Sequence, residues 1–564
     1  MKLRDFKKGL KNEYQKSFKS LPKKSLFKVK YAILSLVLLM SLFLVGEHFY
    51  CGIYNYYVKA EYKDVYALDI TNLLVIDSKD NYEDKLYSVK QLKSSILQRI
   101  FHIQRYIPDK GLSGGGNNKN NQHSGISGAD IAKIDENYIY SIAKNELYIY
   151  ALDGTLLTHA EVAKGDLLYV YEDKIVIIGK NGVEVFSFDN NILIKENSFT
   201  FERYIDSFIV DNKLFIVGGS RFDNNGDYQN IYYDGCSIGN YLYEVISLDL
   251  NNGDIKKINS LNAENIYVYI SEKHIFLANS TYLRYGVFDA NDLTIISIFN
   301  LDLSPVGTIR VEGSILDQTA MNENNNYLRI ITTDILEDSE KVNAISIYDL
   351  KTLRKVGYLN DGIGVEKQVV NSIFFKEDEC YVTTYGENHP YIKLDLSDVY
   401  KPKIAYKTLD ANLLGNLKRF EINGEKYLLN IQLVTDLSAY EMVVYKYTTN
   451  GLERVSNEYR ISENDIEADL LVEINRKAFE DRYELLVVED TNGCYFGLKA
   501  DLNKYYIFKY EVDNQTIKVY KTVEMDEGFK QIRAFKKDNK LILINGNQLL
   551  VKDWDWEMGV SVNC

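Results

Sequence analysis

The feature that most constrains this chain is a pattern of four short strands that recurs, with drift, toward the C-terminus. It is clearest in Ser207–Leu250, where SFIVDNKLFIVGG, a polar insert and YEVISLDL are followed by an Asn-Gly-Asp turn and DIKKINSL. The apolar runs are rich in β-branched and aromatic residues, which favour strands, and Asp, Asn and Gly between them favour turns. The pattern predicts a fold built from repeated antiparallel sheets.

Eight such units can be counted along the sequence, and a three-strand remainder follows them. The units begin at ADIAKI, DLLYVY, SFIVDN, IYVYIS, ILDQTAM, SIFF, LKRFEI and ADLLVEI, and the remainder is IRAFKK, LILING and QLLVKDW. One four-stranded blade cannot bury both of its faces, whereas a closed ring of blades can. We therefore predict an all-β fold, a β-propeller over residues 129–564 with about eight four-stranded blades (seven to nine possible). We expect a strand from the N-terminal side to complete the three-strand remainder.

The N-terminus differs from the rest of the chain in charge and hydropathy. Residues 1–30 hold eleven Lys and Arg against Asp5 and Glu13, which gives this segment a net charge of +9. The formal net charge of the whole chain is −14, so the rest of the chain has a net charge of −14 − 9 = −23. An acidic body argues against a nucleic-acid partner, because neutralising phosphates requires a basic face. Residues 31–46, YAILSLVLLMSLFLVG, contain no charge, and as a helix they would be ~24 Å long.

These two segments together predict a membrane anchor. Residues 1–30 are interpreted as a basic cytoplasmic segment, and residues 31–50 as a transmembrane signal-anchor helix with an aromatic flank. Because Lys and Arg are concentrated before the helix, the N-terminus is predicted to be cytoplasmic and the propeller extracytoplasmic. The alternative is a secreted form cleaved near Ala60, although thirty residues is long for the basic region of a signal peptide.

Two further segments precede the repeats. Residues 51–110 are predicted to form an extracytoplasmic stalk, in which apolar residues at helical spacing indicate a short amphipathic helix over about 86–106. Residues 111–128, GLSGGGNNKNNQHSGISG, are rich in Gly and Asn and are predicted to be a flexible linker. A phosphate-binding loop is disfavoured there, because no strand precedes the glycines and no helix with Lys-Ser/Thr follows them.

Neither cysteine nor histidine falls into a metal-binding pattern. The five Cys are widely spaced without a C-x-x-C pair, and the six His occur singly. One stretch resembles a calcium loop, because Asp223, Asn225, Asp227 and Asp234 place oxygens at positions 1, 3, 5 and 12. Tyr228 occupies the sixth position, where such a loop needs Gly, so a polar loop is favoured over calcium. No metal and no cofactor are predicted.

No catalytic motif is present in the sequence. There is no G-x-S-x-G elbow, and the 80 acidic residues include no carboxylate pair in apolar surroundings that would mark a glycosidase. Trp554 and Trp556, the only two Trp, lie on the last strand, where core packing in the closing blade is favoured over sugar stacking. We predict no catalytic, cofactor-binding or metal-binding residues and no enzyme activity.

Three segments resemble one known family. Residues 128–133, GADIAK, are similar to the opening V-D-E-A-D-I-V-K of that family, and an aromatic strand, Tyr138-Ile-Tyr140, follows them. Residues 306–333 resemble its central segment, which ends in Y-L-R-x-A-T-T, and residues 370–403 resemble its next blade, which ends in D-L-S-D-P-x-x-P-K. The family is that of secreted or membrane-anchored bacterial β-propeller domain-containing proteins, distantly similar to WD40 repeats. The resemblance is collinear over about residues 86–552.

The resemblance implies an exported propeller and brings no established catalytic residues with it. Two departures from the family pattern are visible. Ile126-Ser127-Gly128 replaces Val-Asp-Glu, and the chain after Leu409 reads DANLLGNLKRF where the family has an aromatic- and His-containing segment. A site built from those missing groups is therefore not expected in this chain.

These observations predict a membrane-anchored, extracytoplasmic β-propeller that acts as a protein- or ligand-interaction module at the cell envelope. Its partner, a protein or a carbohydrate, is expected at the loop face, where residues from all blades converge. The alternative is an envelope hydrolase that acts on glycan or peptide with carboxylates at the mouth of the propeller channel. An acidic cluster in a deep axial pocket would favour the hydrolase, and a flat or water-filled channel would favour the module.

Overall fold

The protein was analysed as a computed structural model, in which two compact units are described separately. The first contains the N-terminal helix, and the second contains the repeated sheets. The structure describes residues 23–61, 71–78, 126–162, 165–222, 231–234, 241–262, 265–284, 290–335, 341–364, 368–385, 390–408, 416–434, 439–462, 486–490, 493–501, 504–525, 532–545 and 547–554.

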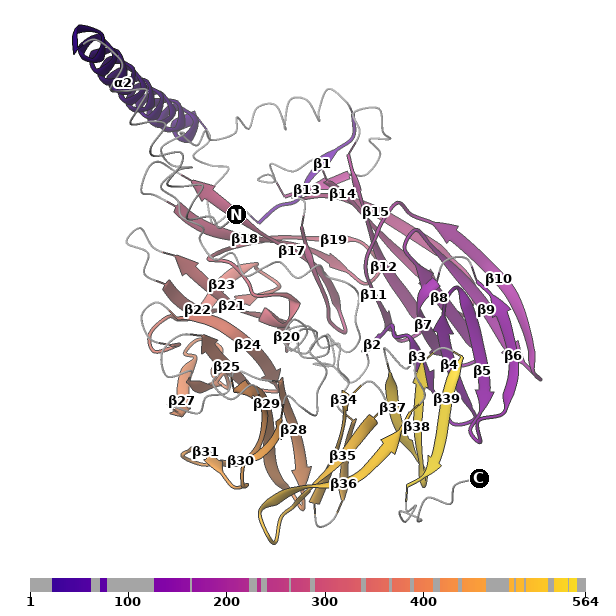
Figure 1. The fold of residues 1–564 in the computed structure, drawn as a ribbon. Coiled ribbons are helices and arrows are strands. Elements are labelled where there is room, and N and C mark those ends of the chain that lie inside the picture. The colour runs from indigo at the N-terminus through magenta and orange to yellow at the C-terminus, as the bar shows by residue number, and fades with distance from the viewer. Residues whose placement is uncertain are drawn as a thin grey trace. The chain divides into compact units, whose positions relative to one another are not determined.

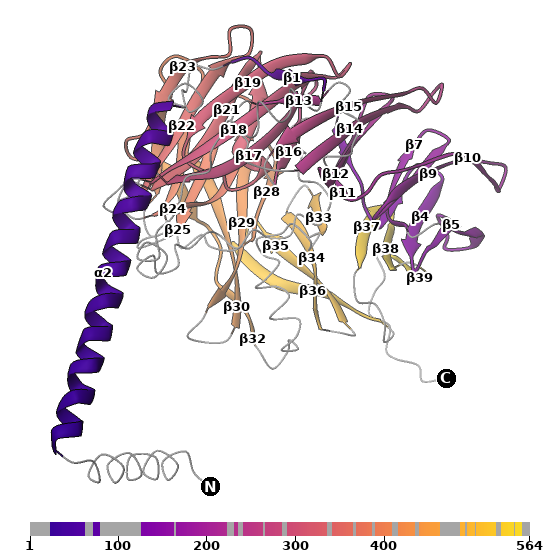
Figure 2. The same ribbon diagram turned by 90° about the horizontal axis from the view of Figure 1, so that it is seen from above.

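The N-terminal unit contains one long helix, α2 (Lys23–Glu61), of 39 residues, which is unbroken (Figure 2). Its most apolar stretch, Leu34–Cys51, has a mean hydropathy of 1.7, and its side chains are almost all exposed. By length and composition this stretch is sufficient to cross a membrane. The predicted apolar helix over residues 31–50 is therefore present and extends beyond both predicted ends, while its location in a membrane stays a prediction.

The second unit consists of nine sheets, numbered here as blades 1 to 9 in chain order (Figure 1). Neighbouring strands within each of the first five blades run antiparallel. Blade 1 consists of β3 (Ala132–Ile134), β4 (Tyr138–Ala143), β5 (Glu146–Ala151) and β6 (Leu156–Glu161), and blade 2 of β7 (Gly165–Tyr171), β8 (Lys174–Gly179), β9 (Gly182–Asp189) and β10 (Ile192–Thr200). Blade 3 consists of β11 (Tyr204–Val210), β12 (Lys213–Arg221), β14 (Tyr241–Asp249) and β15 (Ile255–Asn262), and blade 4 of β16 (Tyr267–Ile270), β17 (His274–Arg284), β18 (Ala290–Asn300) and β19 (Pro305–Glu312). Blade 5 consists of β20 (Met321–Asn324), β21 (Tyr327–Ile335), β22 (Lys341–Asp349) and β23 (Arg354–Leu359).

The last four blades follow the same order, and a short 3₁₀ turn, η2 (Gln318–Ala320), leads from blade 4 into blade 5. Their strands are β24 (Val369–Lys376), β25 (Glu379–Tyr385), β26 (Tyr391–Asp395) and β27 (Lys403–Thr408); β28 (Asn416–Ile422), β29 (Glu425–Val434), β30 (Ala439–Thr448) and β31 (Gly451–Arg454), with β32 (Tyr459–Ser462) also pairing β30; β33 (Leu486–Asp490), β34 (Gly493–Asp501), β35 (Lys504–Glu511) and β36 (Thr516–Glu524); and β37 (Arg533–Lys537), β38 (Lys540–Asn545) and β39 (Gln548–Asp553).

Tight turns close the hairpins at one end of each blade. At Asn423-Gly424, predicted as a hairpin turn, both residues have positive φ, 52° and 79°. The turn between β20 and β21 uses Asn325 and Asn326, with φ of 53° and 64°. Two consecutive left-handed residues define the type I′ turn that matches the twist of a hairpin, and Asn and Gly adopt this conformation at low cost. The Asn-rich composition therefore serves the turns.

A second repeated feature is the residue that follows the third strand of several blades. The N–H of Leu350 donates to the carbonyl of Asn326 (3.0 Å), in the first turn of the same blade, and the N–H of Leu396 donates to that of Asp378 (2.8 Å). Leu250 and Trp554 repeat this bond in blades 3 and 9. The recurring Asp-Leu or Asp-Trp pair at the end of the third strand is thus a structural signature of the blade.

The core is divided among the seams between neighbouring blades. Separate clusters of buried apolar side chains fill the seams between blades 1 and 2, 2 and 3, 3 and 4, 6 and 7, 7 and 8, and 8 and 9, and one large cluster extends over blades 4, 5 and 6. The ring is closed by Ala132, Ile139 and Tyr150 of blade 1, which pack against Ile542 and Ile544 of blade 9. Nine blades lie within the predicted range.

The ring closes differently from the prediction. Blade 9 has three strands among the described residues, and no N-terminal strand completes it. β2 (Ile126–Gly128) instead pairs with β11, the first strand of blade 3. Closure is achieved because the faces of blades 9 and 1 pack directly against each other, so a shared sheet is not required.

Residues before the repeats also join the sheets. β1 (Leu74–Ile76), in the predicted stalk, pairs with β13 (Ile231–Tyr233), which lies along the outer strand of blade 3. The last three residues of the predicted 111–128 linker form β2. Two segments predicted as stalk and linker therefore contribute strands to the sheets, while the predicted helix over 86–106 and the rest of the linker lie outside the described residues.

Residues 71–76, which we call the strap, connect the rims of blades 3 and 4. The carbonyl of Thr71 accepts a hydrogen bond from the N–H of Thr308 in β19 (2.9 Å), and Leu73 packs in the cluster between the two blades. Gly307 permits this close approach, because a Cβ there would lie 2.4 Å from the Thr71 carbonyl oxygen. The strap therefore covers the outer end of this seam.

Candidate functional site

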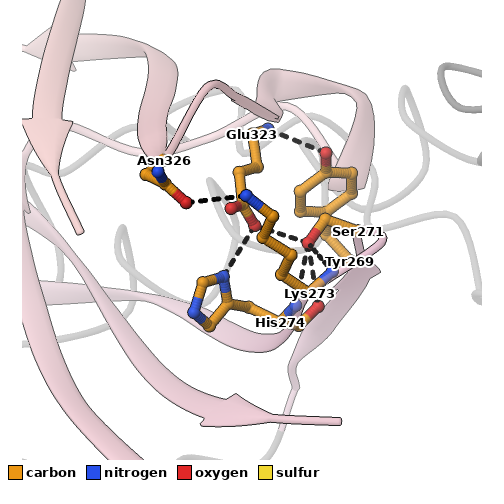
Figure 3. A network of polar contacts seen from close by, with 6 residues as sticks. All are labelled: Tyr269, Ser271, Lys273, His274, Glu323 and Asn326. Atoms are coloured by element: carbon orange, nitrogen blue, oxygen red, sulfur yellow. Dashed lines mark hydrogen bonds and ion pairs between the residues drawn. The ribbon is translucent and has the colours of Figure 1, made fainter. Parts of the chain in front are cut away.

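A polar network joins blades 4 and 5 at the turns between their first two strands (Figure 3). Tyr269 belongs to β16, Ser271 lies in the turn that follows it, and His274 begins β17. Glu323 lies on β20 of the next blade. Glu323 is 5% exposed, so its carboxylate needs hydrogen-bonding partners within the protein.

Two side chains of blade 4 bind the same carboxylate oxygen of blade 5. The Ser271 hydroxyl donates to Glu323 Oε2 (2.5 Å), and His274 Nδ1 lies 2.8 Å from that oxygen. The N–H of Glu323 donates to the Tyr269 hydroxyl (2.8 Å). At the rim of the network, Lys273 Nζ donates to Asn326 Oδ1 (2.9 Å). We call Ser271, His274 and Glu323 the clasp.

The clasp contains the residue types of a hydrolytic triad in a different arrangement. In a triad the histidine lies between the hydroxyl and the carboxylate, so that it can remove the hydroxyl proton. Here the Ser271 hydroxyl is bonded to the carboxylate itself, and its oxygen also accepts from the N–H groups of Lys273 (3.2 Å) and His274 (2.9 Å). This geometry orients the turn and ties two blades together. It does not activate the serine.

A buried ion pair lies at the ring closure. Asp130 Oδ1 is 2.7 Å from Arg533 Nε on β37, and both side chains are less than one-tenth exposed. The backbone of Asp130 also exchanges two hydrogen bonds with Leu168 of blade 2. Burial raises the pKa of Asp130, and the Arg533 guanidinium opposes this shift. Asp130, within the GADIAK motif, thus connects blade 2 with blade 9.

A third cluster holds a half-buried cation between blades 6 and 7. Arg419, on β28, donates to the hydroxyls of Tyr447 (2.8 Å) and Tyr391 (3.1 Å). Its guanidinium carbon lies 3.6 Å from the ring centroid of Phe374 and 4.5 Å from that of Tyr381. Aromatic faces and hydroxyl oxygens stabilise a desolvated guanidinium. These aromatic rings and hydroxyls therefore bind the side chain of Arg419 itself.

The structure describes one residue of the sequence-derived calcium loop. Asp234 is fully buried, and its backbone carbonyl accepts a hydrogen bond from Arg310 Nη2 (2.9 Å). Asp223, Asn225 and Asp227 lie outside the described residues, so calcium binding there stays untested. Among the residues that the structure describes, no group of three or more His, Cys, Asp and Glu could hold a metal ion.

Other singled-out residues have structural environments. Cys51, Cys380 and Cys494 are buried, and burial raises the pKa values of the Cys380 and Cys494 thiols. Trp554 is 7% exposed and packs between blades 8 and 9, as its position on the closing blade predicted. Trp556 lies outside the described residues.

Sequence reasoning did not identify the residues that form these polar clusters. Asp130 and Glu323 lie inside the segments that resemble the family, GADIAK and residues 306–333, so the resemblance was the available signal. His274 was noted only as one of six scattered histidines, since its partner is 49 positions away. Arg419 lies in a segment that departs from the family pattern, and no local motif marks it.

Comparison with known proteins confirms the family resemblance over part of the chain. Residues 219–407 match the family model described as "Beta propeller domain". This segment contains the clasp and runs from blade 3 into blade 6. It includes the second and third segments whose resemblance was recognised in the sequence.

Two curated relatives are each described as an uncharacterized protein. One, from Archaeoglobus fulgidus, is 26% identical over 274 residues, which is 47% of this chain and 38% of the relative. The other, from Methanocaldococcus jannaschii, is 35% identical over 116 residues, 20% of this chain and 18% of the relative. The chain thus matches less than two fifths of the length of either relative. The bacterial origin and extracellular location stay predictions.

Solved structures that resemble the chain include two with high coverage. The WD40 domain of SCAP from fission yeast covers 76% of this chain and 95% of its own, with 10% identity and a TM-score of 0.34. Apo AztD from Citrobacter koseri covers 69% of this chain and 94% of its own, with 11% identity and a TM-score of 0.32. These values are too low to transfer a function.

Proposed function

We propose that this nine-bladed propeller, whose residues 219–407 match the Beta propeller domain, is a non-catalytic interaction module that α2 anchors in a membrane. The observation that carries the proposal is the use of its buried and half-buried charged groups. Glu323, Asp130 and Arg419 each bind groups of another blade, so they stabilise the ring. A ring stabilised in this way presents its loops as a rigid binding surface for a protein or carbohydrate partner.

The apolar helix supports the membrane part of the proposal. The side chains of Leu38 and Leu42 are each 62% exposed, and exposing a continuous run of such residues to water is unfavourable. A bilayer would bury this surface. The Lys and Arg residues before the helix favour a cytoplasmic N-terminus and an extracytoplasmic propeller.

The anchor is tested by the double variant Leu38→Arg and Leu42→Arg in the full chain. Each arginine near the centre of a membrane helix costs about 2.5–3.5 kcal/mol of insertion free energy, so we expect the variant to leave the membrane fraction. Fractionation with an alkaline carbonate wash measures this. Ser41→Ala, between the two sites, is the matched control and should stay with the membrane. Release of the unsubstituted chain by carbonate would refute the anchor.

The interaction role is tested by affinity capture with the full chain from solubilised envelopes. A fragment that begins at residue 86 is unsuitable, because it would lack β1 and the strap. A stoichiometric protein or glycan recovered intact, and absent when the chain is heat-unfolded first, supports the module. Capture of a glycan or peptide that becomes shorter during incubation would contradict it and support the envelope hydrolase.

A further inference from the structure

The face of blade 4 that meets blade 3 carries a buried amide without partners in the protein. Along β17, Ile275 and Leu277 pack in the cluster between blades 3 and 4, whereas Phe276 packs toward blade 5. Because side chains alternate along a strand, Asn279 faces blade 3. It is 1% exposed, and among the described residues neither its amide nitrogen nor its amide oxygen has a hydrogen-bonding partner.

Two hydroxyl groups on the same face of blade 4 are also buried and lack hydrogen-bonding partners among the described residues. Ser297 of β18 and Thr308 of β19 are direct cross-strand partners. Their neighbours Ile296 and Ile309 pack in the cluster that extends toward blade 5, so Ser297 and Thr308 face blade 3. Ser297 is 1% exposed and Thr308 is fully buried, and neither hydroxyl oxygen has a hydrogen-bonding partner in the part of the chain that the structure describes.

Blade 3 contributes further polar groups from the opposite side of this seam. Ile258 of β15 packs in the cluster between blades 3 and 4, and Ser260 and Asn262 follow it at two-residue spacing. Asn262 Nδ2 donates to Ser260 Oγ (3.3 Å), while Asn262 Oδ1 has no hydrogen-bonding partner among the residues that the structure describes. Both side chains are fully buried.

The seam is covered at its rim. The strap lies over its outer end, where the Thr71 carbonyl accepts from the N–H of Thr308, the residue whose hydroxyl faces the seam. Leu73 of the strap packs into the apolar part of the same seam. Arg310 crosses from β19 and donates to the carbonyl of Asp234 (2.9 Å). Thr308 therefore lies beside the strap, and the side chains of Asn262, Asn279, Ser297 and Thr308 are each buried.

The donors and acceptors among these buried polar groups indicate which kind of molecule could form hydrogen bonds with them. Roughly 90% or more of buried polar groups in proteins are bonded to protein or to ordered water. The Asn279 amide nitrogen must donate, the Asn262 and Asn279 amide oxygens must accept, and the two hydroxyls can do either. A small neutral molecule that both donates and accepts meets these needs, and water, which makes two to four bonds in such sites, is the smallest.

We propose that the seam between blades 3 and 4 is a binding site for a cluster of ordered water molecules held by Asn262, Asn279, Ser297 and Thr308. The site is independent of the proposed membrane anchor and of any partner. Its water molecules connect strands of the two blades beside the direct hydrogen bond from Arg310 to the Asp234 carbonyl. The strap separates this water from bulk solvent at the rim.

A crystal structure of the full chain, at a resolution that shows ordered water, tests the proposal directly. We expect density for water within hydrogen-bonding distance of both amide atoms of Asn279. Direct bonds from Asn279 to protein groups, or a seam without solvent density, would overturn the proposal. Density for a larger molecule, such as a polyol, would also overturn the assignment to water.

Substitution tests the site in solution, with Asn343 as the matched control. Asn343 is 3% exposed, but its amide bonds Thr333 (2.7 Å), Ile363 (2.9 Å) and Gln368 (3.2 Å) within the protein. We expect Asn279→Leu to reduce the number of long-lived water molecules seen by oxygen-17 magnetic relaxation dispersion, and Asn343→Leu to leave that number unchanged. We also expect Asn279→Leu to lower Tm, by less than Asn343→Leu does.

The sign of the Tm shift caused by Asn279→Leu distinguishes a seam that contains water from a dry seam. If Asn279 were unpaired and dry, leucine would remove an unsatisfied amide and raise Tm, which would contradict the proposal. Ser297→Ala provides a second reading if Asn279→Leu does not fold. It should also lose long-lived water, and an unchanged water count in a folded Ser297→Ala variant would count against the site.

Discussion

The two faces of blade 4 show how the same strands can meet two neighbours by different means. Toward blade 5, the Ser280 hydroxyl bonds that of Thr294 (3.0 Å), and the clasp bonds a carboxylate across the seam. Toward blade 3, Asn279, the residue next to Ser280, has no hydrogen-bonding partner within the described part of the chain. Adjacent residues of β17 therefore lie in two seams with different chemistry, one satisfied by protein and one proposed to be satisfied by water.

The difference follows from the partners that each neighbour offers. Blade 5 presents Glu323 on its first strand, opposite the turn of blade 4, and its apolar cluster continues into blade 6. Blade 3 presents short polar side chains, Ser260 and Asn262, and relies on the strap at its rim. A propeller thus needs blades that match in shape, while the chemistry of each seam can vary.

The largest expected effect comes from breaking the clasp. Glu323→Ala removes the shared acceptor of Ser271 and His274, and it should lower the free energy of unfolding by about 3 kcal/mol, because bonds to a buried charged group are lost and their donors stay buried. Urea unfolding measures the change. Glu272→Ala, at an exposed site in the same turn, should change it by less than about 0.5 kcal/mol. Equal effects of the two variants would show that the clasp contributes nothing.

A smaller effect is expected from loosening the strap. Leu73→Ala removes part of a half-buried side chain from the seam between blades 3 and 4, and it should cost about 1–2 kcal/mol. Hydrogen exchange should become faster in β19, next to the strap, and stay unchanged in β22 of blade 5. Leu74→Ala, on the same segment but 39% exposed, is the control. Faster exchange in both blades would mean that the two seams open together.

The smallest effect concerns a turn of blade 4. The hydroxyl and the N–H of Ser304 donate to the Asp302 carboxylate and lower its pKa below the usual 3.8. The folded pKa lies below the unfolded one, so this stabilisation is present above about pH 4 and is lost as pH falls through the folded pKa. Asp302→Asn should therefore differ from the unsubstituted chain at pH 7 and converge with it in acid.

Unfolding measured from pH 7 to pH 2.5 checks this expectation. Ser304→Ala removes the hydroxyl donor and should weaken the same pH dependence while keeping the carboxylate. A difference between Asp302→Asn and the unsubstituted chain that grows in acid would contradict the assignment. This effect belongs to one exposed turn, so it should leave the contrast between the two faces of blade 4 unchanged.

Local sequence was sufficient to predict the strands and hairpin turns. It was insufficient to predict which residues form the polar clusters between blades. Alternating apolar runs and Asn-Gly turns marked the hairpins, because strand period and turn chemistry are local properties. The clasp joins residues 49 and 52 positions apart, and Asp130 and Arg533 are 403 apart. Nothing near Asp130 in the sequence indicates which arginine it contacts. A closed ring was predicted, but among the described residues blade 9 packs against blade 1 and is not completed by an N-terminal strand.

The sequence by itself determined a repeated β architecture of seven to nine blades and an apolar N-terminal helix. Both depend on patterns within a few tens of residues, where hydrophobic period and turn residues act. Tertiary structure alone decided that β1 and the strap belong to the ring, that blade 9 has three strands among the described residues, and that Asn279 and Ser280 meet different neighbours. These outcomes depend on which faces become neighbours when the ring closes, and no local segment encodes that.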